Sequence, residues 1–370
     1  VLLSAEGNGG DTVFCLDVTD PHNPTFMWEF AAPELFRSRS SPAVAQIGRI
    51  HDPLTNHAKW VAFFVTGKVE NASLFPAIYM IDISNGSVLH KVVLDDVVDL
   101  DGSGIIEAFE VDYGRGGVPS GQPAVVDSDE NGYIDRMYLG TDKGFMYKIN
   151  IPDDPQNTNS KSVTHCVLNT DMVDEDMNTV AAGQRWHPIY ASPAVVVDNS
   201  ISPLGDIEYN VIVLFGTGDS PYFDENINTA TTRYHFFAYA DTANKMECTP
   251  SKHKLEWFLE LDEGHRIFAS AFAAAGQIYF GTSTSETEDP CEGHLEVDGN
   301  EGRIYAVTLE GVVLLNKVVG DMSTSPLVED EHIYFRTPTG LQSMGSGIYN
   351  NEVQAAGTPS INFRSWREVI

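Results

Sequence analysis

Short apolar runs of strand length recur from one end of the chain to the other. The clearest are residues 60–65, 137–141, 211–217, 278–282 and 333–335. They are rich in Val, Ile, Tyr and Phe, and most of them end at or next to a Gly-Thr or Thr-Gly pair. Few apolar stripes of helical period accompany them. The pattern therefore predicts an all-β protein.

These runs belong to a degenerate repeat. Units open with a small-residue entry to a strand, which is seen at residues 41–44, 122–125, 192–195 and 325–328, and in a weaker copy without proline at 270–273. They close with aromatic-rich hairpins, seen at residues 78–82, 145–149, 235–239 and 304–307. Asn85-Gly86 lies between two alternating runs, and this dipeptide is a strong signal for a tight hairpin turn.

Repetition of short strands around an axis protects the sheet edges, so the repeat favours a β-propeller. Six partial or complete units can be recognised, and residues 13–18 are interpreted as the outer hairpin of a first blade whose inner strand comes from another part of the chain. We expect residues 1–370 to form one domain. A β-sandwich or a β-solenoid is the alternative.

The chain is strongly acidic. It has 22 Lys and Arg against 53 Asp and Glu, a formal net charge of −31. This charge argues against nucleic acid and anionic membrane surfaces as partners and suits cation binding in an extracytoplasmic compartment. No apolar run is long enough to span a membrane. Two long acidic insertions, residues 219–232 and 285–302, are interpreted as face loops that either bind a partner or are simply solvated.

The most informative polar stretch is residues 127–135. Oxygen-bearing side chains occupy loop positions 1, 3, 5 and 9, with Gly132 at position 6 to allow a sharp turn and a main-chain carbonyl at position 7. A hard cation such as Ca²⁺ takes about six to eight oxygens. We predict one calcium site with the ligands Asp127, Asp129, Asn131, Tyr133 and Asp135. Position 12 is Tyr138 instead of Glu, so a strand follows the loop; a solvated acidic turn is the alternative.

A second loop follows the same spacing in residues 99–110. It provides the more complete pattern, because Glu110 stands at position 12. Its flanks are not clear helices. The loop is a candidate for a second calcium site in addition to the first, and an acidic loop with chance spacing is the alternative. The candidate ligands are Asp99, Asp101, Ser103, Ile105, Glu107 and Glu110.

The four cysteines form no C-x-x-C pair, which argues against zinc ribbons and thioredoxin-like chemistry. Cys15 lies in an apolar strand and is predicted to be a buried small hydrophobic residue. Cys248 and Cys291 lie in polar insertions, and in an oxidising compartment they are candidates for a disulfide. The sequence assigns no pairing to Cys166.

Three segments resemble one family. Residues 9–21, with Val13-Phe14-Cys15-Leu16-Asp17-Val18-Thr19-Asp20-Pro21, residues 123–140 around the loop, and the terminal Arg364-Ser365-Trp366-Arg367-Glu368 are similar to C-terminal propellers of PilY-type proteins. These are type IV pilus biogenesis factors and tip-associated adhesins. The resemblance covers nearly the whole chain, although the loop at 99–110 and the acidic insertions have no counterpart in it.

The resemblance implies a modified propeller of about seven blades, and the long acidic loop insertions of this chain are additions to that pattern. It also implies the C-terminal part of a larger exported protein, located in the periplasm, on the outer surface or at the pilus tip (fimbrium). Its calcium occupancy would regulate pilus extension and retraction. The implied partners are pilins or minor pilins, and a host or abiotic surface.

Two other functions compete with this one. In the first, the chain is an adhesive scaffold in which calcium only stiffens a loop. In the second, it is a quinoprotein-like dehydrogenase, for which Trp186, Trp257 and Asp262 are candidates by residue type alone. No H-E-x-x-H, G-x-S-x-G or P-loop motif occurs, so we predict a binding module and no enzyme.

Overall fold

The protein is described here from a computed structural model. The structure describes residues 1–6, 11–35, 45–52, 57–66, 75–94, 119, 121–142, 144–151, 164–167, 188–201, 207–218, 233–242, 253–267, 269–274, 276–284, 301–320, 326–329, 332–337, 340–345 and 354–355. In this part of the chain no helix is long and apolar enough to cross a bilayer.

The described residues form six antiparallel sheets, which we number in chain order. Sheet 1 has three strands, β1 (Leu2–Ala5), β2 (Thr12–Asp17) and β3 (Thr25–Ala31), and is followed by the 3-10 turn η2 (Pro33–Leu35). Sheet 2 contains β4 (Ala45–Asp52), β5 (His57–Val65), β6 (Ala77–Asp82) and β7 (Val88–Val93). Sheet 3 contains β8 (Ala124–Val126), β9 (Arg136–Gly140), β10 (Met146–Asn150) and β11 (Thr164–Val167).

The other three sheets repeat the same four-stranded meander. Sheet 4 contains β12 (Ala194–Ile201), β13 (Ile207–Gly216), β14 (His235–Asp241) and β15 (His253–Glu260). Sheet 5 contains β16 (Phe272–Ala274), β17 (Gln277–Ser283), β18 (Gly302–Thr308) and β19 (Val313–Val318). Sheet 6 contains β20 (Leu327–Glu329), β21 (His332–Thr337), β22 (Gly340–Gly345) and β23 (Gln354–Ala355).

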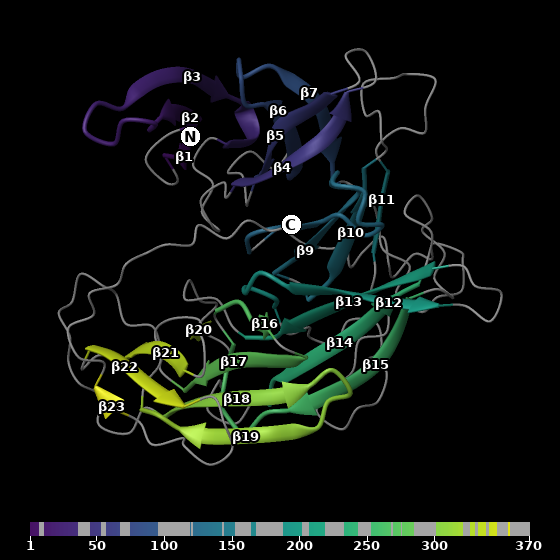
Figure 1. The fold of residues 1–370 in the computed structure, drawn as a ribbon, viewed down its shortest axis with the longest axis vertical. Helices are drawn as coiled ribbons and strands as arrows, with labels where there is room; N and C mark the ends of the chain where they lie inside the picture. Colours follow the sequence, from purple (N-terminus) through teal and green to yellow (C-terminus); the bar gives the residue numbers. More distant parts are fainter. Residues whose placement is uncertain are drawn as a thin grey trace.

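The sheets follow one another along an arc, from sheet 1 to sheet 6 (Figure 1). The first strands of successive sheets contact one another, β4 with β8, β8 with β12, β12 with β16 and β16 with β20. These first strands therefore line the inside of the arc, and the last strand of each sheet lies outside. This is the radial arrangement of a β-propeller.

Each pair of neighbouring sheets shares an apolar core. Alternate residues of a strand point to opposite faces. In β5, Val61, Phe63 and Val65 therefore pack toward sheet 3, whereas Ala62 and Phe64 pack toward sheet 1. Similar clusters join sheets 3 and 4, sheets 4 and 5, and sheets 5 and 6. The near-continuous apolar runs in the sequence arise because the central strands are buried on both faces.

Two tryptophans tie an outer strand to the next sheet. The indole N–H of Trp28 on β3 donates to the carbonyl of Ile83, 2.6 Å away, at the β6–β7 turn. The indole N–H of Trp257 on β15 donates to the carbonyl of Leu309, also 2.6 Å away, at the β18–β19 turn. A glycine with positive φ lies against each ring: Gly86 against Trp28 and Gly311 against Trp257.

Most sequence expectations for the fold are confirmed. The predicted entries at residues 122–125, 192–195, 270–273 and 325–328 lead into β8, β12, β16 and β20. The predicted Asn85-Gly86 hairpin joins β6 and β7, with Gly86 at φ 74°. Residues 13–18 fall mainly on β2, which pairs with both β1 and β3. Cys15 is a buried free thiol whose Sγ lies 3.7 Å from Met27 Sδ. The number of blades in the complete propeller stays a prediction.

Candidate metal site

The predicted calcium loop connects β8 to β9 in sheet 3. Its ends are held together by the strand pair Val126–Arg136 and by the Asp135 N–H, which donates to the Val126 carbonyl over 3.0 Å. Two positive φ angles, 56° at Glu130 and 90° at Gly132, let the chain turn tightly. Glycine adopts such angles without steric cost, which explains its place at the sixth loop position.

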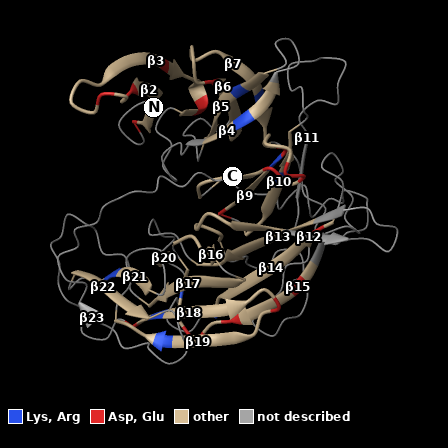
Figure 2. Cartoon of the chain, viewed as in Figure 1, with Lys and Arg blue, Asp and Glu red and all other residues tan. Residues whose placement is uncertain are grey.

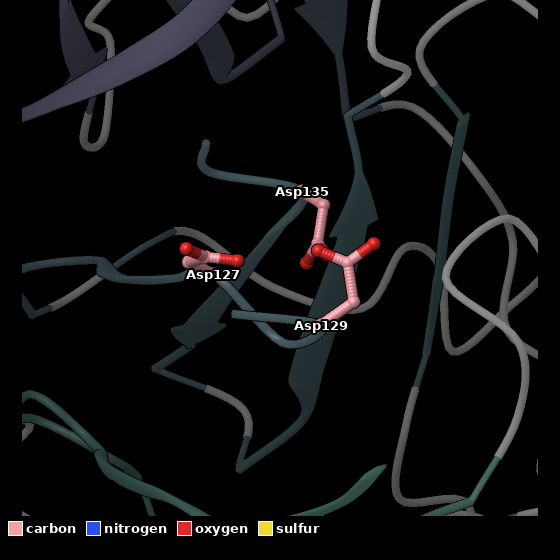
Figure 3. A group of neighbouring side chains, drawn as sticks. All are labelled: Asp127, Asp129 and Asp135. Atoms are coloured by element: carbon pink, nitrogen blue, oxygen red, sulfur yellow. The ribbon is translucent and has the colours of Figure 1, made fainter. Parts of the chain in front are cut away.

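Three carboxylates converge in this loop (Figure 3). One oxygen from each of Asp127, Asp129 and Asp135 lies within 4.8 Å of the other two. Asp127 and Asp129 are half-buried, whereas Asp135 is 1% exposed. Three acidic groups this close repel one another when ionised, and a divalent cation would remove the repulsion.

Hydrogen bonds within the loop fix two of these carboxylates. Asp127 accepts from the N–H of Asn131, at 3.0 Å, and from the N–H of Gly132, at 2.5 Å. Asp135 accepts from the Ser128 N–H, at 3.2 Å, and from the Ser128 hydroxyl, at 2.9 Å. Hydrogen bonds from residues of the loop itself thus help to position the first and ninth residues of the pattern.

Burial raises the pKa values of two of these carboxyl groups. Burial raises the pKa of Asp135 to about 6, although the bonds from Ser128 and the charge of Arg136 oppose the shift. Burial also raises the pKa of Asp127, against the hydrogen bonds from Gly132 and Asn131. Both shifts mean that the ionised form costs free energy here. A bound cation would reverse that cost.

The donor set fits a hard cation. It is made of oxygen atoms alone, and the loop is short enough for one ion to touch all three carboxylates. The Asn131 side-chain oxygen, which the pattern makes the fifth-position ligand, accepts a hydrogen bond from the Tyr133 N–H over 2.9 Å. The structure therefore brings Asp127, Asp129 and Asp135 together, whereas the Asn131 side chain bonds to the loop backbone.

The loop also packs against sheet 2. The Ile134 N–H donates to the Arg49 carbonyl on β4 over 2.7 Å. The Ile134 side chain lies directly over Gly48, where an added Cβ would be 2.4 Å from its Cγ1. The ring of Tyr133 meets His51 edge-on, with centroids 5.4 Å apart. An ion in this loop would order a segment that contacts two sheets.

Several predicted site residues lie elsewhere. The second loop, with Asp99, Asp101, Ser103, Ile105, Glu107 and Glu110, falls outside the described residues, and so do Trp186, Cys248 and Cys291. Asp262 is an ion-pair partner of Arg303, with Oδ2 and Nη1 2.8 Å apart, and Trp257 packs against sheet 5.

Sequence analysis missed a group of buried charges beside the loop. Arg136 follows Asp135 directly. Lys148 lies on β10 of the same sheet, and Asp241 lies on β14 of sheet 4. The available signal was a charged residue inside an otherwise apolar strand, as in Met146-Tyr147-Lys148-Ile149. Only the fold reveals that residues from two different repeats meet.

The family follows from a comparison of the whole chain with known proteins. Residues 1–255 match the model of the PilY1 beta-propeller domain. The chain belongs to the PilY1 β-propeller family. The predicted resemblance is therefore confirmed, and the described calcium-loop candidate lies inside the matched region.

Individual members of the PilY1 family agree with this assignment. The type IV pilus biogenesis factor PilY1 of Pseudomonas aeruginosa strain PAK is 29% identical over 157 residues, 41% of this chain. A PilY1 homolog of Xylella fastidiosa is 27% identical over 163 residues, 42% of this chain. The matched segments span only 11% and 10% of those relatives.

A solved structure supports the fold independently. The crystal structure of the Pseudomonas aeruginosa PilY1 C-terminal domain superposes with a TM-score of 0.60 at 16% identity. The match covers 96% of this chain and 81% of that domain. At this identity the likeness confirms the architecture and leaves the chemistry of the site to the residues themselves.

Proposed function

We propose that this chain is a calcium-binding propeller module of a type IV pilus biogenesis protein. The observation that carries the proposal is the convergence of Asp127, Asp129 and Asp135 in the β8–β9 loop. The printed names of the PilY1 relatives supply the pilus context. The module would act outside the cytoplasm, in the periplasm, on the outer surface or at the pilus tip.

The proposed mechanism is electrostatic. Without metal, the three carboxylates repel and the burial of Asp135 disfavours its charge. Calcium neutralises them and fixes the loop against β4 and β9. The ordered loop would change the surface presented to a pilin or minor pilin, and in this way calcium would regulate pilus extension and retraction.

The first test is calorimetric titration of calcium into the chelator-stripped chain. We expect Asp127→Ala to abolish binding at the loop. Asp20→Ala is the matched control, because Asp20 also accepts bonds from its own turn, the His22 N–H and the Asn23 side chain, but lies outside the carboxylate cluster. Calcium affinity that Asp127→Ala leaves unchanged would refute the site.

The second loop is tested in the same titration. Two binding events in the parent, of which Asp99→Ala removes one and Asp127→Ala the other, would establish the calcium site of residues 99–110. A single event that survives Asp99→Ala would reduce that loop to a solvated turn.

A scaffold in which calcium only stiffens a loop is the second candidate, and the docking of Ile134 and Tyr133 on β4 favours it. The two candidates differ in cells that carry Asp127→Ala in the full-length protein. Altered extension or retraction with normal protein level indicates regulation. A lower protein level with normal pilus dynamics indicates a scaffold that contacts pilins or a host or abiotic surface passively.

A binding module also predicts no binding of pyrroloquinoline quinone.

A further inference from the structure

A group of buried charges joins sheet 3 to sheet 4 next to the loop. Oδ2 of Asp241, on β14, accepts hydrogen bonds from the guanidinium Nη1 of Arg136 at 3.0 Å and from the Tyr138 hydroxyl at 2.7 Å. The Lys148 ammonium lies 2.8 Å from the same oxygen. Tyr138 and Arg136 lie on β9 and Lys148 lies on β10, so one carboxylate of sheet 4 holds three side chains of sheet 3.

These charges are fully removed from solvent. The Lys148 and Asp241 side chains are 0% exposed, and the Arg136 side chain is 4% exposed. Burial opposes the charge of Asp241, but Lys148 and Arg136 hold its pKa below the usual value, so it is ionised at neutral pH. Figure 2 shows how sparse charged positions are on the strands, which makes such a concentration unusual. Charges buried this deeply interact strongly, because little water screens them.

Arg136 connects this group to the β8–β9 loop. Its Nε lies 4.0 Å from Oδ1 of Asp135, the buried carboxylate of the loop, while its Nη1 is bound to Asp241. The guanidinium therefore lies between two buried carboxylates and is shared by them. A cation bound to Asp135 and the Arg136 guanidinium compete for the same negative charge.

We propose that Asp241 sets the calcium affinity of the β8–β9 loop by holding Arg136 away from Asp135. The inference rests on the proposed calcium site. Asp241 is a positioning residue that belongs to the neighbouring sheet and does not touch the ion. Because linked binding equilibria are reciprocal, calcium in the loop pushes Arg136 toward Asp241 and strengthens the contact between sheets 3 and 4. Metal binding is thereby transmitted beyond the loop.

The proposal predicts that substitutions of Asp241 and of Lys148 shift the calcium affinity in opposite directions. In Asp241→Asn, Arg136 loses its competing anion and turns to Asp135, so calcium affinity falls by about tenfold or more. In Lys148→Met, a buried cation is replaced by a neutral side chain of similar shape. Asp241 then holds Arg136 more firmly, and calcium affinity rises by about three- to tenfold. A general loss of stability would not raise the calcium affinity in one variant and lower it in the other.

The experiment is calorimetric titration of calcium into the chelator-stripped chain and its variants, with thermal unfolding measured in parallel. Tyr279→Phe is the matched control, because it removes one side-chain hydrogen bond, from the Tyr279 hydroxyl to Gln277 on β17, away from the cluster and without changing charge, and its calcium affinity should stay within about twofold of the parent. Arg233→Gln controls for long-range charge effects, because Arg233 is exposed, lies just before β14 and pairs with Glu260 and Glu263.

The outcomes separate this proposal from the one it rests on. No calcium binding in the parent overturns both. Binding in the parent that Asp127→Ala abolishes, combined with shifts of the same sign or no shift in Asp241→Asn and Lys148→Met, overturns the positioning role alone. If Asp241→Asn does not fold, Lys148→Met still decides the question, since an unchanged or weaker affinity contradicts the proposal.

Discussion

Neighbouring sheets of this propeller are joined in two chemically different ways. Sheets 1 and 2, and again sheets 4 and 5, are tied by a tryptophan that lies on a turn glycine and donates to a turn carbonyl. Sheets 3 and 4 are tied by Asp241 and two buried cations beside the β8–β9 loop. The neutral contact depends on the fit of the ring against the glycine and on one hydrogen bond. A contact made of buried charges responds to any ion bound nearby, so we expect calcium to act on the second kind of contact and to leave the first unchanged.

The largest effect should come from breaking a tryptophan contact by overpacking. A Cβ added at Gly86 would lie 2.8 Å from the Trp28 ring, at a φ of 74° that disfavours side chains. We expect Gly86→Ala to lower the free energy of unfolding by about 2–4 kcal/mol in chemical denaturation. The further stabilisation that saturating calcium provides should be unchanged, because the contact carries no charge.

Gly276→Ala is the matched control for Gly86→Ala. Gly276 has nearly the same φ, 76°, but no atom lies within 4 Å of an added Cβ. The substitution should therefore show the backbone strain alone, about 1 kcal/mol. Equal losses in the two variants would mean that the tryptophan contact contributes little to stability.

The arrangement of strands was predictable because each repeat carries its own local signals. The Pro-Ala-Val entries, the Gly-Thr ends and Asn85-Gly86 depend on neighbouring residues only. The convergence of Asp127, Asp129 and Asp135 was predictable for the same reason, since nine consecutive residues contain the whole cluster. Hydrogen bonds within the loop position Asp127 and Asp135 locally, although the loop also packs against β4.

The tryptophan contacts and the charge cluster were not predictable in this way. Trp28 meets a turn that lies 55 residues further along the chain, and Arg136 meets Asp241 across 105 residues. Such pairings depend on how far each sheet is rotated relative to the next. A sequence without its fold contains no measure of that rotation, so Lys148 and Asp241 remained ordinary charges in apolar strands.

The second prediction concerns the charge of the loop itself. Asp135→Asn replaces a carboxyl group whose pKa is raised by burial to about 6. We expect the metal-free variant to be more stable than the metal-free parent by about 1–2 kcal/mol at pH 7, while calcium no longer stabilises it. Denaturation with chelator and with excess calcium measures both effects. A variant that is less stable than the parent in chelator would show that Asp135 contributes favourable interactions even without metal.

The same substitution has a defined pH dependence. A carboxyl with a raised pKa in the folded state binds its proton more tightly there than in the unfolded state, so it destabilises the fold at pH values above its folded pKa. As the pH falls from about 6 toward 3.8, that destabilisation disappears. The advantage of Asp135→Asn over the parent in chelator should therefore be larger at pH 7 than at pH 5. A difference that is independent of pH would exclude the raised pKa as its cause.

The smallest expected effect concerns the hydrogen bond of the tryptophan contact between sheets 4 and 5. Trp257→Phe keeps an aromatic ring against Gly311 but removes the indole N–H that donates to Leu309. We expect a loss of about 1 kcal/mol in the free energy of unfolding, since a partly buried carbonyl loses its donor. Trp60→Phe is the control, because Trp60 is 55% exposed and should change stability by less than about 0.5 kcal/mol. Calcium affinity should match the parent in both variants. A shift in affinity with Trp257→Phe would mean that sheets 4 and 5 also transmit metal binding, and the division into responsive and unresponsive contacts would then be wrong.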